Sequence, residues 1–356
     1  MLKAALFSMD SISSNRIFAA MQKYFGSVDH FDIRKVEVRI GSGTPRILYK
    51  GCEIKNSYDC VYLKSSFRFS LMLKTLATFF QGKAYMPSDP ESFTIVNDKI
   101  FTHIALEKAG VSSPETYITS TVSEAKRVLK ELKFPIIIKT PGGTHGKGVM
   151  YAESFAAAAS ILDTMSELRQ TVLLQEYIET GGCDIRAIVV GDRVAASMAR
   201  KAVKEEKRAN LHAGGVAEPV ELDANTKKIA VQAAKALNSE ICGIDILQGV
   251  KGPLVIEANL SPGMQGIMKA TGKDVANEIA KFLFKKSEEF RKTGLTNAEA
   301  IVKEVSARSE QQIITSLDFR GERILLPVVA TKLSGLGEQD VVIRISKGRV
   351  EIEKSR

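Results

Sequence analysis

The first 95 residues alternate short apolar segments with amphipathic helical patterns, and this alternation narrows the folds open to the chain. Strands that alternate with helices are typical of a parallel sheet covered by helices. We therefore expect a parallel α/β domain over residues 1–95, which ends at the turn-rich segment 86–90. The predicted strands lie at 3–9, 28–33 and 60–64, and the predicted helices lie at 14–24 and 69–80.

The length of 356 residues exceeds the roughly 250–300 residues that one hydrophobic core supports, so further domains should follow. Residues 96–178 and 179–292 mix strands with helices, whereas residues 293–356 change to short strands with turns. That change predicts a small antiparallel, β-rich C-terminal extension. The predicted helices of the middle region lie at 97–109, 123–132, 154–165, 225–237 and 274–290. The predicted elements of the extension are a helix at 297–306 and strands at 312–319, 323–330, 341–345 and 349–352.

The composition is that of a globular protein, with 44% hydrophobic and 26% charged residues. No segment approaches the roughly 18 apolar residues of a membrane span. The four cysteines are scattered without a CxxC pair, which argues against a zinc ribbon and against a disulfide framework. We therefore expect a cytoplasmic protein with no membrane partner.

The excess of 50 Lys and Arg over 41 Asp and Glu gives a net charge of +9. Nucleic acid binding is one explanation of such an excess. The basic residues are spread along the chain, however, without a tract interleaved with aromatic residues. A field that attracts small anionic substrates fits as well, and we favour it over a nucleic acid partner.

Two predicted strands, 243–247 and 255–259, carry polar side chains among apolar ones. Buried carboxylates are costly unless they are paired or bound to a metal. Glu257 and Asn259 are two residues apart and so face the same side of a strand, and Asp245 on the neighbouring strand could join them. Such oxygen ligands suit Mg²⁺, which is bound by one or two carboxylates together with substrate phosphates. Solvent-facing acids on ordinary strands are the alternative.

A glycine-rich loop at 140–148 follows the predicted strand 135–140 and leads into another strand. Glycine permits close backbone approach, so the loop could direct N–H groups at a phosphate as a hairpin lid. A plain hairpin turn is the alternative. Lys139 just before the loop, and Lys99 near a helix start, are candidate phosphate cations, although either could simply be solvated.

Three arginines lie after the glycine-rich loop in the sequence, on two predicted strands and in a polar loop. Arg186 and Arg200 fall on two strands joined by the turn 190–193, and Arg208 begins the polar loop 208–215. Arginine is favoured where a carboxylate or phosphate is held by two parallel hydrogen bonds. Singly, each could be a surface residue, but as a set near the acids they predict a site for anionic substrates.

These motifs, in this order, resemble the RimK-like branch of the ATP-grasp superfamily, the ATP-dependent α-L-glutamate ligases. The resemblance spans roughly residues 95–290, and residues 1–95 fit the family's N-terminal domain only in kind. The residues that carry it are 97–99, Lys139, 143–149, 175–178, 182–186, 210–215, 243–247, 257–263 and 271–272.

The resemblance implies an α+β ATP-grasp unit with lobes at 96–178 and 179–292, ATP as cofactor, and two Mg²⁺ ions that Mn²⁺ could replace. The metal ligands would be Asp245, Glu257 and Asn259. The catalytic residues facing the phosphates and the acyl phosphate would be Arg186, Arg200, Arg208 and Asn210. The ATP-binding residues would be Lys99, Lys139, Gly143, Thr144, Gly146, Gly148, Glu176, Ile178 and Asp184.

The implied reaction is ligation of L-glutamate or another amino acid to an acceptor carboxylate, through an acyl phosphate. The acceptor could be a peptide, a protein C-terminus, a coenzyme or a carrier, and only the segment 64–68 hints at acceptor contacts. The extension beyond the ligase unit suggests a partner or a homo-oligomer. The alternatives are an ATP-binding interaction protein and an RNA- or ribosome-associated protein with a degenerate ligase site.

Overall fold

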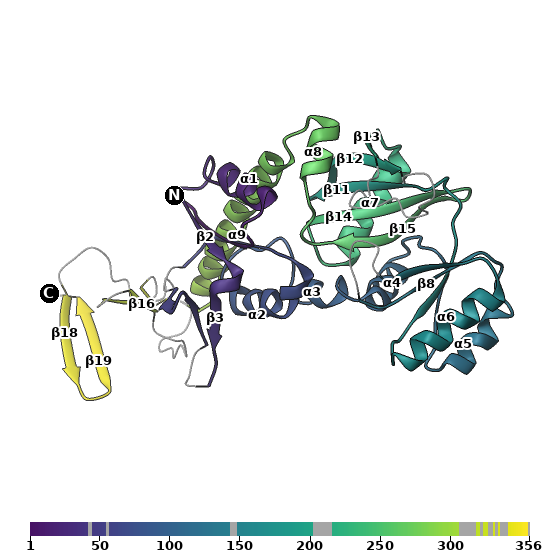
Figure 1. Ribbon diagram of the computed structural model, residues 1–356. Helices are drawn as coiled ribbons and strands as arrows, with labels where there is room; N and C mark the ends of the chain where they lie inside the picture. Colours follow the sequence, from purple (N-terminus) through teal and green to yellow (C-terminus); the bar gives the residue numbers. More distant parts are fainter. Residues whose placement is uncertain are drawn as a thin grey trace. The chain divides into compact units, whose positions relative to one another are not determined.

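The computed structural model describes residues 1–41, 45–54, 57–142, 148–201, 216–305, 318–320, 323–326, 330–331, 334 and 341–354. The chain forms two compact units, Met1–Ser287 and Glu288–Arg356 (Figure 1). None of the helices in the described part of the chain is both long and apolar enough to cross a membrane.

The first unit begins with a three-stranded parallel sheet in the order β2-β1-β6, which confirms the predicted parallel α/β arrangement. A small antiparallel sheet, β3-β4-β5, was not predicted from the sequence, because its short strands are rich in charged and exposed residues. The elements of this region are β1 (Lys3–Ser8), α1 (Ile12–Met21), β2 (Ser27–Asp32), β3 (Val36–Arg39), β4 (Arg46–Tyr49), β5 (Cys52–Glu53), β6 (Cys60–Lys64) and α2 (Ser70–Phe80).

Both faces of the parallel sheet are buried. Ala5 and Phe7 of β1 belong to a core cluster that includes α2, whereas Ala4 and Leu6 belong to a second cluster that includes α1 and α9 (Val275–Val305). Successive residues of a strand point to opposite faces, so the apolar run of β1 serves both cores. The carboxyl ends of these strands are therefore the part of the sheet left for polar residues.

An antiparallel four-stranded sheet follows, in the order β7-β10-β8-β9. Ile136, Ile138 and Leu174 lie on its covered face, in a core cluster with residues of α5 and α6 (Figure 1). The alternate residues, such as Ile137 and Lys139, are left for the opposite face. The elements are β7 (Thr116–Ile118), α5 (Val122–Leu129), β8 (Ile136–Lys139), β9 (Val149–Ala152), α6 (Phe155–Glu167) and β10 (Leu173–Glu176).

An antiparallel five-stranded sheet in the order β13-β12-β11-β14-β15 completes the first unit. Ala187 and Ile244 belong to a cluster with α7, whereas Ile188 and Met198 belong to a cluster with α8 and α9. The elements are β11 (Cys183–Val190), β12 (Arg193–Lys201), β13 (Val216–Pro219), α7 (Ala224–Ala236), β14 (Ile241–Gly249), β15 (Gly252–Asn259) and α8 (Gln265–Thr271).

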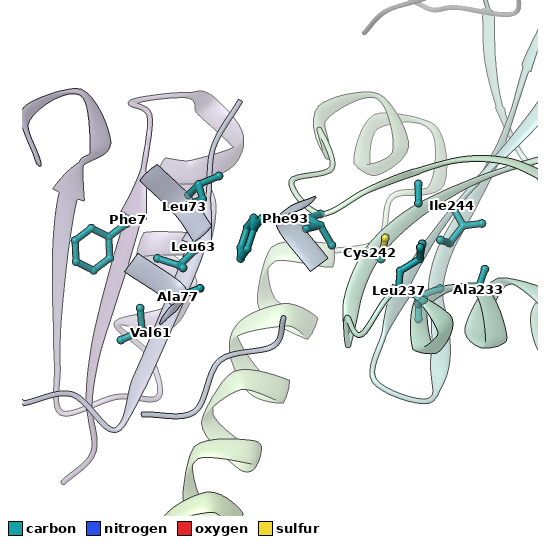
Figure 2. Close-up of a cluster of buried hydrophobic side chains, with 14 of the residues drawn as sticks. Phe7, Val61, Leu63, Leu73, Ala77, Phe93, Ala233, Leu237, Cys242 and Ile244 are labelled. Carbon is teal, nitrogen blue, oxygen red and sulfur yellow. The ribbon is translucent and has the colours of Figure 1, made fainter. Parts of the chain in front are cut away.

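One hydrophobic cluster joins the parallel sheet to the five-stranded sheet. Figure 2 shows Phe93 of α3 (Ser92–Ile95) between Leu63 and Leu73 on one side and Leu237 and Cys242 on the other. Burial of an aromatic ring removes a large apolar area from water, so this contact stabilises the arrangement that brings the two sheets to one cavity. Helix α4 (Lys99–Lys108) follows α3 and begins with Asp98, whose carboxylate accepts from the Ile100 amide.

The sequence prediction was wrong about one helix near the chain's second unit. A separate helix was expected at 297–306, but α9 runs without interruption from Val275 to Val305. Glycine in a helix interior costs only about 1 kcal/mol relative to alanine, so Gly294 weakens the helix without ending it.

The extension is β-rich where it is described, as predicted. It contains two antiparallel hairpins, β16 (Asp318–Arg320) with β17 (Arg323–Leu325) and β18 (Val341–Ser346) with β19 (Arg349–Lys354). Residues 312–317 and 327–329 of the expected strands at 312–319 and 323–330 lie outside the described residues, whereas Leu326 is not in a strand and Ala330 is helical, so the expected strand 323–330 is too long.

Candidate active site

A cavity of about 800 Å³ lies in the first unit and is lined by residues of all three larger sheets and of α4. From the parallel sheet it receives Lys64, and from the four-stranded sheet Lys139. From the five-stranded sheet it receives the charged residues Asp184, Arg186, Arg200, Asp245 and Glu257 and the amide of Asn259. Every candidate site residue in the described part of the chain, apart from Gly148, therefore lines this cavity or directly borders it.

The register of the five-stranded sheet explains why these charges meet. Asp184 lies opposite Arg200 on β12, and Arg186 lies opposite Asp245 on β14. Asp245 in turn lies opposite Glu257 on β15. Directly opposed residues on neighbouring strands share a face, so one end of the sheet presents a charged surface.

Asp245 is ion-paired with two arginines. Its Oδ1 accepts from Arg186 Nε at 2.6 Å, and its Oδ2 accepts from Arg186 Nη2 at 2.5 Å. Arg200 Nη2 lies 2.8 Å from the same Oδ2 and also donates to Asp184. Asp184 Oδ1 accepts from Arg200 Nε at 2.6 Å. Two arginines and two aspartates thus form one buried network.

Burial acts to raise the pKa of Asp245, which is only 4% exposed, but the two guanidinium groups outweigh it and hold that pKa low. For Asp184, burial together with the negative charge of Asp245 raises the pKa despite the bond to Arg200. Two guanidinium groups and two carboxylates thus lie in direct contact, so each buried charge has a partner of opposite sign, which is the condition for burying them.

Glu257 has a different environment. Among the described residues no donor is within hydrogen-bonding distance of its carboxylate, and burial together with Asp245 raises its pKa, while Lys99 and Lys139 act to lower it. Asn259 Oδ1 accepts one hydrogen bond, from the Ser261 amide at 2.8 Å. Both side chains retain acceptor positions toward the cavity.

The candidate metal set combines two carboxylates with an amide. In the described part of the chain, no group of three or more His, Cys, Asp or Glu side chains is placed to hold a metal by itself. A set with two carboxylates suits Mg²⁺, whose remaining ligands come from substrate phosphates and water.

Two lysines of the facing wall carry positive charge into the cavity. Lys139 ends β8 and is 8% exposed, and burial lowers its pKa to about 8 although Glu257 acts in the opposite direction. Lys99 is half-buried in the first turn of α4, with its Nζ 3.5 Å from the Pro141 carbonyl oxygen. Lys139 has no ion pair among the described residues, and a buried ammonium of this kind is costly and is stabilised by an anion that enters the cavity.

The loop between β8 and β9 is a hairpin, as predicted. Lys139 pairs with Val149, and the Thr140 amide donates to the Gly148 carbonyl at 2.9 Å. Gly148 has φ of +78°, and a Cβ there would meet Thr140 Oγ1 at 2.2 Å, so only glycine fits. The loop residues Gly143, Thr144 and Gly146, and the candidates Arg208 and Asn210, lie outside the described residues.

The candidate adenosine contacts lie just after β10. The strand ends at Glu176, whose Oε1 accepts from the Glu115 amide at 3.0 Å. Ile178 approaches the β14–β15 turn, since a Cβ on Gly249 would lie 3.2 Å from Ile178 Cγ2. The apolar residues lining this part of the cavity are Ile137, Val149, Tyr177, Ile178, Leu247 and Ile256.

Sequence reasoning gave no role to a buried polar cluster behind Lys139. His103 of α4 lies with its Nε2 3.2 Å from Gln175 Nε2, and Gln175 also donates to Thr116 Oγ1 at 2.7 Å. Burial and the nearby lysines lower the pKa of His103 to about 4, so the ring is neutral. The only sequence signal was an apolar helix face interrupted by histidine.

Comparison with known proteins identifies relatives over most of the chain. A family model described as the RimK-like ATP-grasp domain matches residues 96–283. A probable alpha-L-glutamate ligase of Thioalkalivibrio sulfidiphilus is 35% identical over 287 residues, which cover 79% of this chain and 95% of that protein. A probable alpha-L-glutamate ligase of Shewanella loihica is 37% identical over 279 residues, covering 77% and 92%.

Solved structures share the fold. The ATP-grasp ligase PsnB, complexed with a phosphomimetic variant of minimal precursor, Mg and ADP, aligns with a TM-score of 0.61 and 21% identity over 81% of this chain and 99% of PsnB. The RimK domain protein ATP-grasp from Sphaerobacter thermophilus aligns with a TM-score of 0.59 and 18% identity, over 79% and 99%.

The fold and these relatives define the class of the protein, which is that of ATP-dependent carbon–nitrogen ligases. Within that class the chain belongs to the RimK-like ATP-grasp family. The resemblance drawn from the ordered motifs is therefore confirmed, together with the predicted fold class.

Proposed function

We propose that the protein ligates L-glutamate, or a similar amino acid, to an acceptor carboxylate with ATP and magnesium, through an acyl phosphate. The observation that carries this proposal is that oxygen ligands and buried lysines face one cavity from different sheets. Relatives named probable alpha-L-glutamate ligase support glutamate as the added amino acid.

The residues present fit a magnesium–nucleotide complex. The Asp245 carboxylate offers about four acceptor positions, of which three are used by Arg186 and Arg200, so one on Oδ1 remains. Glu257 offers its full set, and Asn259 Oδ1 keeps one position. We propose that these three residues hold two Mg²⁺ ions, which Mn²⁺ could replace.

On the other wall, the lysines would hold phosphate groups. Lys139 is buried without an ion pair among the described residues, so an anionic phosphate beside it removes an electrostatic penalty. Lys99 lies at the start of α4, where the positive end of the helix dipole adds to its charge. The apolar residues near Ile178 would contact the adenine ring.

ATP with magnesium would supply a phosphoryl group that converts the acceptor carboxylate into an acyl phosphate, which an amine can attack. The protein then mainly needs to position the groups and neutralise charge. Arg186 and Arg200 border the proposed metal site, and with the candidates Arg208 and Asn210 they would stabilise the negative charge that develops there. The nucleophile is the amine of the substrate, so the histidines need not act as general bases.

The test is to incubate the full chain with ATP, Mg²⁺, L-glutamate and a pool of peptides with free carboxylates. We expect ADP and phosphate, with loss of both on chelation and recovery with added Mg²⁺ or Mn²⁺. Release of AMP and pyrophosphate would contradict the proposal, and mass spectrometry of the pool would identify the acceptor.

A further inference from the structure

A second cationic position lies on the wall of the cavity formed by the parallel sheet. Lys64 is the last residue of β6, is 5% exposed, and lines the cavity with its neighbours Ser65 and Ser66. The carboxyl ends of parallel strands are where α/β sheets bind ligands. Lys64 thus carries a buried charge and lines a cavity that a ligand could enter.

No acidic group in the part of the chain that the structure describes compensates the charge of Lys64. Among the described residues none makes a hydrogen bond or an ion pair with Lys64, and burial alone accounts for the lowering of its pKa to about 8. The nearest strand ends of the same sheet offer no free acid, because Asp32 on β2 is held by Arg34 and Ser8 on β1 bonds to His30. A buried ammonium with no counter-charge is destabilising unless a ligand supplies one.

The next residue provides a second unsatisfied group. Ser65 is 9% exposed, and among the described residues its Oγ has no hydrogen-bond partner, which is unusual for a buried hydroxyl. Its backbone amide donates to Ser261 Oγ at 2.9 Å, and the Ser261 amide donates to Asn259 Oδ1 at 2.8 Å. This chain of bonds links Ser65 to the proposed metal site.

We propose that Lys64 and Ser65 form a subsite for a substrate carboxylate that is held but not activated. The substrate would be a dicarboxylic amino acid or a peptide that ends in one. This proposal rests on the proposed function, because it assigns one part of the same cavity to a substrate of the ligation. A carboxylate matches one ammonium and one hydroxyl donor, whereas the phosphate-facing lysines Lys99 and Lys139 come from α4 and the four-stranded sheet.

The test measures binding to the full chain preloaded with Mg²⁺ and ADP. The titrants are L-glutamate and N-acetyl-L-glutamate, which keeps both carboxylates but has no nucleophilic amine. In Lys64→Met, binding should weaken at least tenfold, with partial recovery in Lys64→Arg, since loss of a hydrogen bond to a charged group costs about 1.5–3 kcal/mol. Ser65→Ala should weaken binding by about three- to tenfold. The matched control is Lys23→Met, which removes the same charge from an exposed position and should bind like the wild type.

The two titrants separate the source of the carboxylate. A loss confined to L-glutamate assigns the subsite to the amine substrate, and a loss that includes N-acetyl-L-glutamate assigns it to the acceptor. Two readouts guard against a merely structural effect: Lys64→Met should melt at a higher temperature than the wild type, and its affinity for Mg²⁺ and ADP should be unchanged.

Equal binding by Lys64→Met and the wild type would overturn the subsite, as would a wild type that binds neither titrant. Loss of ADP affinity in Lys64→Met would overturn it too, because Lys64 would then serve the nucleotide. Failure of the proposed function is distinguishable from these results, since it would appear as a wild type that makes no ADP and yet binds a dicarboxylate through Lys64.

Discussion

The walls of the cavity differ in whether their buried charges are paired within the protein. On the five-stranded sheet, Arg186 and Arg200 pair with Asp184 and Asp245, and every bond lies within the protein. On the other walls, Lys139 and Lys64 are as deeply buried, but neither has an ion pair among the described residues. The two arginines and two aspartates of the five-stranded sheet neutralise one another before any substrate arrives. Lys139 and Lys64 are neutralised only when an anion binds.

The paired residues stabilise the folded protein, whereas the unpaired buried lysines destabilise it. Removing one member of a buried ion pair leaves an uncompensated charge, whereas removing an unpaired charge relieves a penalty. The comparison therefore predicts opposite signs for stability on the two walls. Activity, in contrast, should fall on both.

The largest effect is expected for Glu257→Gln. The side chain accepts no hydrogen bond from the described residues and burial raises its pKa, so the fold should persist with a melting temperature at or above that of the wild type. Magnesium-dependent ADP release should fall by about 10³-fold or more, because a lost metal ligand removes several kcal/mol of transition-state stabilisation. The measurement is initial-rate ADP formation. A variant with normal rates would exclude Glu257 from the metal site.

Arg200→Met should be the most destabilising change. Arg200 is bonded to both Asp184 and Asp245, so its loss leaves two buried carboxylates with fewer donors and should cost about 3–5 kcal/mol of unfolding free energy. Urea denaturation measures this loss. Arg127→Met is the control, because Arg127 pairs with Glu124 and Glu131 at the exposed surface, and its loss should leave the melting temperature unchanged. Equal losses of unfolding free energy in Arg200→Met and Arg127→Met would contradict a stabilising role of the buried network.

Lys64→Met should have the opposite sign and stabilise the free protein by up to about 3 kcal/mol at pH 7. Burial lowers the pKa of Lys64 from an ordinary value of 10.5 to about 8. Between these values the unfolded chain keeps a proton that the folded chain has released, so this group makes wild-type stability rise with pH across the window.

The advantage of Lys64→Met over the wild type should consequently be full below pH 8 and vanish by about pH 10.5. Chemical denaturation of both proteins at pH 7, 9 and 10.5 measures the difference. A variant that is less stable than the wild type at pH 7 would show that Lys64 has a stabilising partner.

Lys139→Met should give the smallest change in free energy of this series, about 2 kcal/mol in nucleotide affinity. The dissociation constant for Mg²⁺ and ATP should rise by roughly tenfold to a hundredfold, since a charge-assisted bond to phosphate is lost. Lys139→Arg, which keeps the charge, should retain more affinity than Lys139→Met. Unchanged affinity in both would remove Lys139 from the nucleotide site.

Much of the fold was predictable from local pattern. Strand β1 was predicted at 3–9 and found at Lys3–Ser8, and the strands bearing Asp245 and Glu257 were predicted as neighbours and found paired. The β3-β4-β5 sheet was not predicted because its strands are only four, four and two residues long. The length of α9 was missed because a single glycine does not end a helix that other residues favour.

The candidate site was predictable as a set of residues but not as a set of interactions. The resemblance named Arg186, Arg200 and Asp245, yet nothing in the sequence indicated that the arginines would bond to that acid. Lys64 was noted only as part of the segment 64–68, which hinted at acceptor contacts. The roles of these residues in binding and catalysis remain predictions that the variants above test.

The sequence by itself determined the strand and helix pattern, the order of the motifs and the family, because periodicity and spacing are local properties of the chain. Only the tertiary structure decided which buried charges have partners. Arg186 meets Asp245 across 59 positions, and Lys64 meets no acid at all among the described residues. The energy of a buried charge depends on what surrounds it, and those surroundings come from sheets that lie far apart in sequence.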